Sequence, residues 1–411
     1  MKVLILSFYS PPDQTPGAFR IDALIKELLN ELPDESSIQL FTTMPNRYQS
    51  YQKQAKELQE EGSLKIIRAN IPSHKSGFID QSLSFISYAR QVVKLTKSQD
   101  YDLIFASTSR LMTGALGAYL ARRYRIPFYL DIRDIFTDTF ENIFPKIVVF
   151  CLKPGFNFLE RYTLKTANKV NLISKGFYKY FNSKYNIKNF SYFTNGIDLD
   201  FIKFYSERKK LISKGKLHKN KTLKVLYAGN IGMGQGLDII VPGIASELRD
   251  KVEFKIIGSG GRLLALKDKI NKHNLTNINI FDPIDRKDLI EEYLDSDILF
   301  LHLNEFKAFE KVLPSKIFEY AATGKPIWAG LGGFSASFLR KEVPNTAVFS
   351  PANVSEAIRS LDTLKMGFVN RDEFIKKYSR VSISKLLAKD VISIFQQFRN
   401  ADSKQKIERV K

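Results

Sequence analysis

Residues 314–326 read PSKIFEYAATGKP, and this stretch is the most informative of the chain. The pattern predicts a short helix that opens at its proline and stops at Gly324, which takes a positive φ at little cost. N–H groups near Ser315 and Lys316 have no partner in such a helix and, with its dipole, they offer an anion site. Lys316 and Glu319 are three positions apart and share a face. A cation at a phosphate cradle and a carboxylate one turn deeper suit a sugar nucleotide; an ordinary solvated helix is the alternative.

Short apolar runs alternate with helical patterns along the whole chain. The strand patterns fall at 3–8, 38–42, 64–68, 103–106, 127–131, 170–173 and 192–194 in the first half, and at 224–227, 253–257, 278–281, 298–301, 326–329 and 347–349 in the second. Helical patterns lie between them, for example at 18–32 and 114–123. Nearly continuous apolar runs are typical of parallel strands buried on both faces, so the alternation predicts doubly wound α/β domains.

The length of 411 residues exceeds what one compact core usually holds, so two domains are expected. A basic, polar stretch with few strand signals, 203–221, separates the two halves. We therefore predict two Rossmann-like domains, 1–205 and 220–375, that face a central cleft. Ligands bind at the carboxyl ends of parallel strands, so site residues are expected in the loops that follow the strands. The segment 382–400 has the apolar spacing of a final helix.

Composition and charge narrow the classes of function. A hydrophobic content of 44% and a charged content of 26% describe a globular protein. The net charge of +20 favours a polyanionic partner, such as nucleic acid, an anionic membrane or a phosphorylated substrate. The single Cys151 excludes a disulfide framework and a cysteine-ligated metal site, and it fits a reducing compartment.

Apolar runs are too short for a signal peptide or a membrane-spanning helix. The opening segment 1–13 is broken by two prolines, and no run approaches the roughly 20 residues that a bilayer span needs. Basic residues lie beside apolar and aromatic ones at 145–169, and a second basic cluster occupies 122–125. This combination favours a cytoplasmic protein that is peripheral at an anionic membrane surface; a surface that is merely basic is the alternative.

Two glycine-rich loops follow predicted strands in the second half. The loop 228–238 reads AGNIGMGQGLD, and its glycines, beginning with Gly229, let the backbone approach a ligand closely. Its spacing is neither G-x-G-x-x-G nor a P-loop, so a dinucleotide site is not supported. The turn 258–262 reads GSGGR, with Gly258 at the strand end. Arg262 either contacts an anion or is solvated, and solvation is the favoured expectation.

Two strand ends in the first half also have features of a site. The loop after the first strand contains Gly17, which opens the next helix and can face a phosphate; an ordinary turn glycine is the alternative. The strand 127–131 leads into Asp131, Arg133 and Asp134. Charges at a strand end are costly unless they are solvated, paired or functional. These three either orient hydroxyl groups of a ligand or satisfy one another as an ion-pair cluster.

The segments quoted above resemble glycosyltransferase family 4, a retaining family with the GT-B fold. The likeness spans nearly the whole chain and is nearest to bacterial members that build O-antigen, capsule and related surface polysaccharides. The motifs that carry it are KVLILSFYSPPD with GAFR, LDIRD, FTNGID, LYAGNIG with QGLD, IIGSGG and LPSKIFEYAATGKP. The resemblance implies that the C-terminal helix crosses back to the N-terminal domain.

The resemblance also assigns donor-binding residues. It implies that the amides of Ser315 and Lys316 hold the diphosphate, that Glu319 binds the ribose hydroxyls, and that Gly17 faces the diphosphate from the first domain. The family's Arg and Lys after the first strand of the second domain are here Asn230 and Gln235. Charge balance suggests that Lys316 supplies the missing positive charge.

Two further positions depart from the family pattern. The first carboxylate of the family's pair of glutamates, which contacts the donor sugar, falls at Lys311, with Glu310 one residue out of register. Which of these two replaces it stays open. Arg133 lies near the place where many members have a His beside the reacting sugar, so Arg133 and Asp134 are acceptor-side candidates.

The implied activity is transfer of a sugar, with retention, from a nucleotide sugar to a lipid-linked saccharide. The donor is expected to be UDP-linked, with an N-acetylated hexosamine among the candidates, and the acceptor a polyprenyl-diphosphate-linked saccharide at the inner face of the cytoplasmic membrane. No metal and no cofactor are expected, because the leaving diphosphate itself helps to deprotonate the acceptor on the same face. Lys316, Arg133 and Asp134 are the candidate catalytic residues.

A metal route and two other functions are weaker alternatives. Asp-x-Asp occurs at 198–200 and at 295–297, a form that chelates manganese in other glycosyltransferases, but it is short and frequent by chance. A nucleotide-sugar epimerase would share the fold and the donor site but would need no acceptor. A nucleic-acid-binding protein would explain the charge, but no zinc-finger or RNA-binding motif is recognised.

Overall fold

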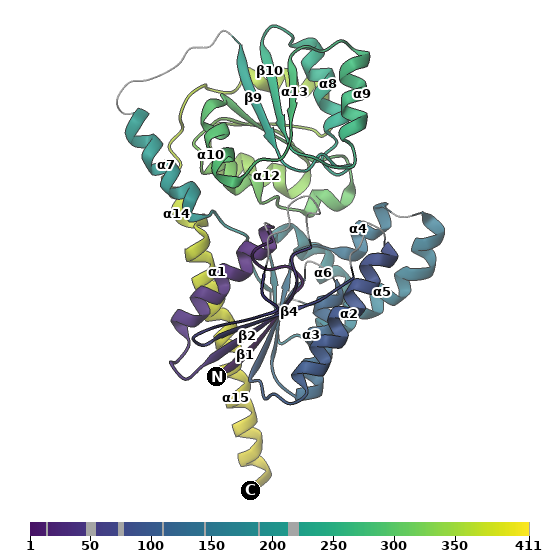
Figure 1. The fold of residues 1–411 in the computed structure, drawn as a ribbon, viewed down its shortest axis with the longest axis vertical. Helices are drawn as coiled ribbons and strands as arrows, with labels where there is room; N and C mark the ends of the chain where they lie inside the picture. The colour runs from purple at the N-terminus through teal and green to yellow at the C-terminus, as the bar shows by residue number, and fades with distance from the viewer. Residues whose placement is uncertain are drawn as a thin grey trace. The chain divides into compact units, whose positions relative to one another are not determined.

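The structure is a computed structural model of the chain and describes residues 1–13, 15–46, 55–72, 78–108, 111–143, 145–187, 190–212 and 222–410. The chain divides into two compact units (Figure 1). The first unit is Met1–Asn195 with Arg380–Lys411, and the second is Gly196–Ser379. Each is built around its own sheet, so the predicted doubly wound α/β architecture is confirmed.

The first unit contains an eight-stranded sheet in the order β3-β4-β2-β1-β5-β6-β7-β8. Its strands are β1 (Lys2–Ser7), β2 (Ser37–Thr43), β3 (Leu58–Glu61), β4 (Leu64–Ala69), β5 (Leu103–Thr108), β6 (Phe128–Ile132), β7 (Lys169–Leu172) and β8 (Phe190–Ser191). Its helices are α1 (Pro16–Glu31), α2 (Phe78–Thr96), α3 (Leu111–Tyr124), α4 (Phe136–Ile143), α5 (Lys146–Thr166), η1 (Lys175–Phe177), α6 (Tyr178–Tyr185) and α15 (Arg380–Val410). All pairings are parallel except β3 with β4.

The second unit contains a six-stranded parallel sheet in the order β11-β10-β9-β12-β13-β14. Its strands are β9 (Leu223–Ala228), β10 (Val252–Ile257), β11 (Ile278–Phe281), β12 (Ile298–His302), β13 (Ile327–Gly330) and β14 (Thr346–Phe349). Its helices are α7 (Leu199–Ile212), α8 (Leu237–Glu247), α9 (Leu263–Lys272), α10 (Arg286–Asp295), η2 (Lys307–Lys311), α11 (Lys316–Ala321), α12 (Gly333–Glu342), α13 (Val354–Leu361) and α14 (Asp372–Tyr378). Apolar clusters on its two faces bury the sheet.

The C-terminal helix belongs to the first unit, as the resemblance implied. Helix α15 packs along α1, and the two lie side by side in Figure 1. Leu387 and Val391 of α15 are buried in one cluster with Leu24 and Leu28 of α1 and with Val3 of β1. Burial of this apolar face, rather than helix propensity alone, therefore anchors α15 to the first sheet.

The boundary between the units lies earlier than the expected position at 205. Half of the stretch 203–221, expected to be a linker, is the end of helix α7. Phe201 and Tyr205 of this helix are buried in the core of the second unit. Removing their apolar rings from water stabilises the helix there, whereas a solvated linker would leave them exposed. The rest of the stretch, residues 213–221, lies outside the described residues.

Three local predictions need correction. The strand expected at 192–194 ends at Ser191, because the carbonyls that would continue the ladder accept hydrogen bonds from a buried arginine side chain. Strand β3 was missed, because its sequence LQEE is polar and almost wholly exposed. The helix after Pro314 begins only at Lys316, with Ser315 as its N-cap, and Gly324 adopts a φ of +70° just beyond its end.

Candidate functional site

The lysine of the short helix α11 lies on the first glycine of the loop after β9. A Cβ atom at Gly229 would be 2.6 Å from Nζ of Lys316, and the φ of Gly229 is +147°. Both facts require glycine here, because a side chain would displace the ammonium and few residues adopt this φ. The chain thus places a cation directly at the carboxyl end of the central strand β9, where parallel α/β sheets bind ligands.

The second glycine turn supports the first by backbone contact. A Cβ atom at Gly258 would overlap the carbonyl oxygen of Gly229. The Gly229 N–H donates to the Ile257 carbonyl at 2.8 Å, and the Ile231 N–H donates to that of Ser259 at 2.8 Å. Gly258 therefore holds the loop of Gly229 in place, and its role in the structure is to let two backbone turns meet.

Neutral side chains occupy the loop positions where the resemblance to family 4 leads one to expect cations. The Asn230 Nδ2 donates to Oε1 of Gln235 at 2.7 Å, and the Tyr227 hydroxyl donates to the Asn230 carbonyl at 2.6 Å. Asn230 and Gln235 therefore fix the shape of the loop and add no charge to it. Lys316 brings its positive charge to Gly229. That it takes the place of the missing cations stays a prediction.

The side chains of Lys316 and Glu319 have hydrogen-bonding capacity that the described residues do not use. Within the part of the chain that the structure describes, neither side chain makes a hydrogen bond or a close ion pair. Partial burial lowers the pKa of Lys316, and the nearby Glu319 carboxylate opposes this shift. A cation that has lost hydration without gaining a partner is ready to bind an anionic ligand. Ser315 is half-buried at the N-cap beside them.

The carboxylates of both Asp-x-Asp pairs already have partners in the structure. Arg286, at the start of α10, forms an ion pair with Asp198 and lies 3.9 Å from the carboxylate of Asp200. Asp295 pairs with Lys224 at 2.8 Å, and the backbone N–H of Lys224 donates to Asp297 at 2.9 Å. In the described ranges, no three or more His, Cys, Asp or Glu side chains gather as metal ligands. Metal independence itself stays a prediction.

The two remaining positions of the family pattern lie near the loop after β13. Glu310, in η2, has its backbone against Gly333, where a Cβ atom would overlap the Glu310 carbonyl oxygen. Its side chain lies near Gly332. Lys311 is half-buried at the end of η2. Which of Glu310 and Lys311 contacts a donor sugar stays open.

A buried histidine, which the sequence did not single out, fixes the far end of the glycine loop. His302 ends strand β12 and is fully buried. Its Nε2 accepts from the Ala352 N–H at 3.0 Å, so the proton lies on Nδ1, which donates to the Gln235 carbonyl at 2.6 Å. Burial lowers the pKa of His302 to about 4, opposed by the bond to Gln235.

Acid is therefore expected to weaken the second unit through His302. The folded state binds fewer protons than the unfolded chain between pH 6.5 and about 4, so stability is complete above pH 6.5 and falls as the pH drops toward 4. The loss attributable to this ring is about 3 kcal/mol. Thermal unfolding of the wild type and of His302→Asn from pH 7.5 downward would measure it. The gap between them should shrink with acid, whereas His273→Asn, at an exposed ring, should follow the wild type throughout.

Gly17 and Arg133 meet in the first unit. A Cβ atom at Gly17 would overlap the guanidinium of Arg133, so a larger residue here would displace that guanidinium. Thr15 is the N-cap of α1 and accepts from the Ala18 N–H at 3.1 Å. Arg133 is half-buried and Asp134 is exposed. The chain thus puts a guanidinium at the beginning of α1, at the carboxyl ends of β1 and β6.

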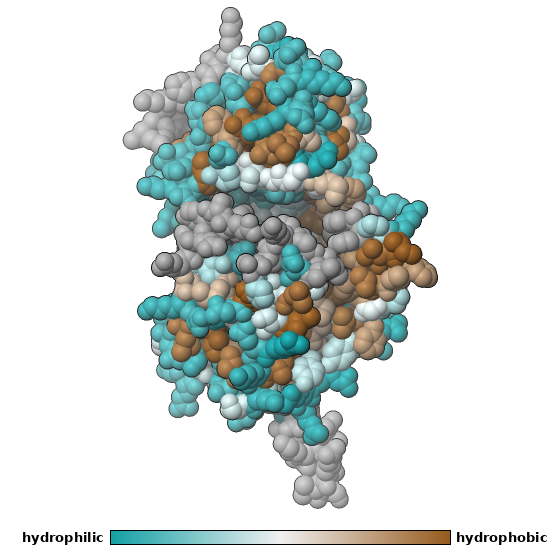
Figure 2. Space-filling model, turned by 45° about the vertical axis from the view of Figure 1, so that its right-hand side comes forward, coloured by the Kyte–Doolittle hydropathy of each residue, from teal (hydrophilic) through white to brown (hydrophobic). Residues whose placement is uncertain are grey.

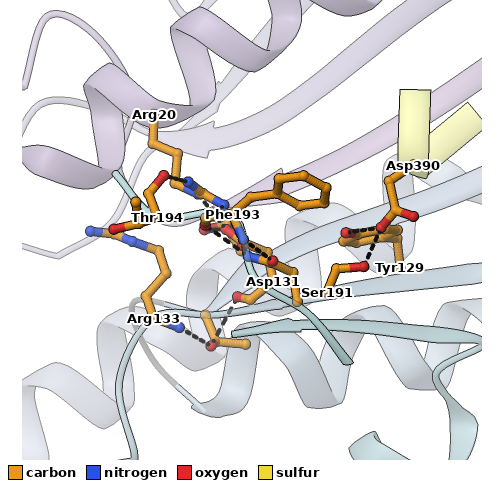
Figure 3. Close-up of polar contacts among 11 residues, drawn as sticks. Arg20, Tyr129, Asp131, Arg133, Ser191, Phe193, Thr194 and Asp390 are labelled. Atoms are coloured by element: carbon orange, nitrogen blue, oxygen red, sulfur yellow. Dashed lines mark hydrogen bonds and ion pairs between the residues drawn. The ribbon is translucent and has the colours of Figure 1, made fainter. Parts of the chain in front are cut away.

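Asp131 is separate from this pair and is structural. Arg20 holds both of its carboxylate oxygens at 2.9 Å, Ser107 donates to it at 3.1 Å, and Asn171 donates at 2.8 Å (Figure 3). Arg20 also donates to the carbonyls of Phe193 and Thr194. Burial raises the pKa of Asp131, but Arg20 and Asn171 outweigh it, so the pKa lies below its ordinary value.

The sequence analysis treated Asp131, Arg133 and Asp134 as one charged set, and the structure separates Asp131 from the other two. Asp131 is paired and buried, whereas Arg133 and Asp134 remain at the strand end. Arg262 is exposed, as expected, and its guanidinium also pairs with the buried Asp238 at 2.6 Å. Arg20, Arg286 and His302 were missed, since their partners lie far away in sequence; for Arg20, its place in the GAFR motif was the available signal.

Comparison with known proteins supports this picture. Residues 208–380 match the family described as Glycosyl transferases group 1. A curated protein of Escherichia coli (strain K12), the candidate colanic acid biosynthesis glycosyl transferase WcaI, is 34% identical over 109 residues, which are 26% of this chain and 26% of that protein. The match thus spans about a quarter of the length of this relative.

Solved structures resemble the whole chain at low identity. HepE of Anabaena in complex with UDP has a TM-score of 0.60 at 15% identity, over 98% of this chain and 100% of that one. Sucrose-phosphate synthase from Thermosynechococcus elongatus reaches 0.65 at 12%, over 99% and 98%. WaaG, a glycosyltransferase involved in lipopolysaccharide biosynthesis, reaches 0.60 at 13%, over 96% and 98%. The chain therefore has the GT-B fold, and its residues 208–380 match the Glycosyl transferases group 1 family, which supports the prediction of a glycosyltransferase at the level of this domain.

Proposed function

We propose that the chain is a retaining glycosyltransferase of family 4 that transfers a sugar from a UDP-sugar to a lipid-linked saccharide in surface-polysaccharide synthesis. The observation that carries the proposal is the contact of Lys316 with Gly229 at the carboxyl end of β9, with Glu319 one turn along the same helix. A diphosphate meets the cation and the glycine backbone there, and a ribose meets the carboxylate. The UDP complex of HepE and the names of WcaI and WaaG agree with this class of donor and pathway.

The chemistry asks little of the protein beyond electrostatics. As the bond between the sugar and the diphosphate breaks, negative charge grows on the leaving phosphate oxygen. Lys316 is placed to stabilise this charge, because its ammonium lies at Gly229 without another partner among the described residues. The departing oxygen then takes the proton of the acceptor hydroxyl on the same face of the sugar. No metal and no cofactor enter this scheme, since the lysine provides the charge.

The acceptor is assigned to the first unit. Arg133 and Asp134 follow β6, and the guanidinium lies at Gly17. A guanidinium binds phosphate oxygens in bidentate fashion, which suits the diphosphate of a polyprenyl-linked acceptor, and an exposed carboxylate can orient sugar hydroxyls. Asp131 has no part in this contact, because Arg20 and Asn171 already saturate it.

Replacement of Glu319 tests the donor assignment. Glu319→Ala is expected to weaken UDP binding about tenfold, because hydrogen bonds to a charged group contribute roughly 1.5–3 kcal/mol. Isothermal titration calorimetry with UDP and with free pyrophosphate measures this directly. Pyrophosphate affinity should be unchanged, since it has no ribose. Equal UDP affinity in wild type and variant would remove Glu319 from the ribose contact.

The reaction itself is tested by product analysis. The enzyme is incubated with a panel of UDP-sugars, and slow release of UDP identifies the donor even without acceptor. Release that accelerates only when a polyprenyl-diphosphate-linked saccharide is added supports transfer. An epimerised nucleotide sugar formed without acceptor would instead show an epimerase, and the proposal would fall.

A further inference from the structure

Helix α5 presents its apolar side chains to solvent. Ile147 is 70% exposed, Phe150 is 79% exposed and Phe158 is 68% exposed. Cys151 and Leu152 are exposed between them. Positions 147, 151, 154, 158, 161 and 165 follow one another at intervals of four and three, so they form one line along the helix. This line, together with Phe150 three positions after Ile147 at its edge, is here called the α5 stripe. Every position of this stripe is exposed.

The opposite face of α5 is firmly packed. Phe156 contacts the rings of Phe136 and Phe140 of α4 edge-on, with centroids 5.0 and 5.1 Å apart. Glu160 is buried and accepts hydrogen bonds from Thr137 of α4 and from Tyr180 and other side chains of α6. These contacts hold the helix in one orientation, so the exposure of the α5 stripe is built into the unit.

The charge around the α5 stripe is positive. Lys146, Arg161 and Lys165 are exposed, and the only acidic residue of the helix, Glu160, is buried. Arg122 of α3 adds to this group, because its guanidinium lies 5.7 Å from the ring centroid of Tyr162 on α5. Figure 2 shows a brown patch on the side of the first unit that carries α4 and α5, with teal surface beside it. Exposed apolar side chains next to basic ones are the pattern of helices that lie in an anionic membrane interface.

We propose that the α5 stripe is a docking surface for an anionic lipid bilayer, with Ile147, Phe150 and Phe158 entering the interface and Arg161, Lys165 and Arg122 binding lipid phosphates. Across the described ranges, no helix is long and apolar enough to cross a bilayer, so contact of this kind would be peripheral. A dimer through the same stripe is disfavoured, because it would bring two basic surfaces together.

The α5 stripe follows the candidate acceptor residues closely in the chain, which suggests what membrane binding would be for. Strand β6 leads through Arg133 and Asp134 directly into α4, which begins at Phe136 and is followed by α5. A bilayer bound at α5 would therefore lie close in sequence to the residues assigned to the acceptor. This purpose rests on the proposed function, because it presumes a lipid-linked acceptor, whereas the docking surface rests on the side chains alone.

Vesicle sedimentation tests the surface with the full chain. Vesicles of phosphatidylcholine containing phosphatidylglycerol should retain the wild type, and pure phosphatidylcholine should retain far less. Ile147→Ser with Phe158→Ser should reduce partitioning by about a hundredfold, because each apolar side chain contributes roughly tenfold. Arg161→Gln with Lys165→Gln should reduce it by roughly thirtyfold on phosphatidylglycerol, and added salt should mimic this loss.

A matched control is Leu264→Ser, which removes an apolar side chain that is 76% exposed on α9 of the second unit. It should leave partitioning unchanged, and thermal unfolding should show that all variants fold. Unchanged vesicle binding in the Ile147→Ser, Phe158→Ser variant would overturn the inference, as would light scattering that shows a wild-type dimer and a monomeric variant with equal vesicle binding.

UDP release in solution separates the two proposals. A wild type that hydrolyses a UDP-sugar but ignores anionic vesicles would overturn the docking surface and leave the proposed function intact. A wild type that binds vesicles through the stripe but binds no UDP-sugar would uphold the docking surface and overturn the proposed function.

Discussion

Lys316→Ala is expected to lower the rate of sugar transfer by roughly a hundredfold, the usual loss when one donor to a developing oxyanion is removed. The ammonium at Gly229 has no hydrogen-bond or ion-pair partner in the described part of the chain, so its charge is available to the leaving phosphate. Asn230 and Gln235 bind each other and cannot replace it. Turnover with saturating donor and acceptor gives the effect on kcat, and UDP calorimetry gives the effect on binding.

The control for this variant is Lys287→Ala, which removes an exposed lysine from α10 of the same unit. It changes the net charge by the same amount as Lys316→Ala but leaves the loop after β9 intact, so its kcat should match that of the wild type. If Lys316→Ala turns over within a factor of about three of the wild type, the lysine is not part of the reaction. A loss confined to KM would mean that Lys316 binds the donor and the transition state equally well.

Arg20→Met is expected to destabilise the first unit by about 3–5 kcal/mol, because it leaves the Asp131 carboxylate buried without its counter-ion. Both side chains are almost completely buried, and Arg20 also holds the carbonyls of Phe193 and Thr194 (Figure 3). The variant removes the charge and keeps most of the volume. Urea unfolding followed by far-UV circular dichroism would report the loss as an earlier transition of the first unit.

Two companions make this result interpretable. Asp134→Asn changes an exposed carboxylate next to the same strand and should alter stability by less than about 0.5 kcal/mol. Arg20→Met combined with Asp131→Leu should recover part of the loss, because no buried charge then remains unpaired. A stability of Arg20→Met equal to that of the wild type would show that the Asp131 network does not hold the unit together.

The fold was accessible from sequence because parallel strands leave a local trace. Strands such as β1 and β5 are apolar on both faces, and their runs stand out between helical patterns. Strand β3 left no such trace, since it pairs at the sheet edge with polar residues. The shortened end of β8 followed from Arg20, which no neighbouring residue announces.

The candidate site divides in the same way. Lys316 and Glu319 lie on one helical turn, so their proximity follows from spacing alone. The pairing of Arg20 with Asp131 spans 111 positions, and that of Arg286 with Asp198 spans 88, so each depends on how the chain folds back. This explains why Asp131 looked like a member of a reactive set. Its charge is paired with Arg20, which the local sequence does not show.

The two ends of the second unit leave it side by side. Ile197 forms a β-bridge with Ser379, and its N–H donates to the Tyr378 carbonyl at 2.7 Å, while in the first unit the Arg380 side chain donates to the Asn195 carbonyl at 3.0 Å. A segment whose beginning and end meet can be excised and exchanged as a cassette. Under the proposed function, chimeras that carry the 196–379 segment of a related glycosyltransferase between Asn195 and Arg380 are expected to keep the acceptor specificity of the first unit and to acquire a new donor.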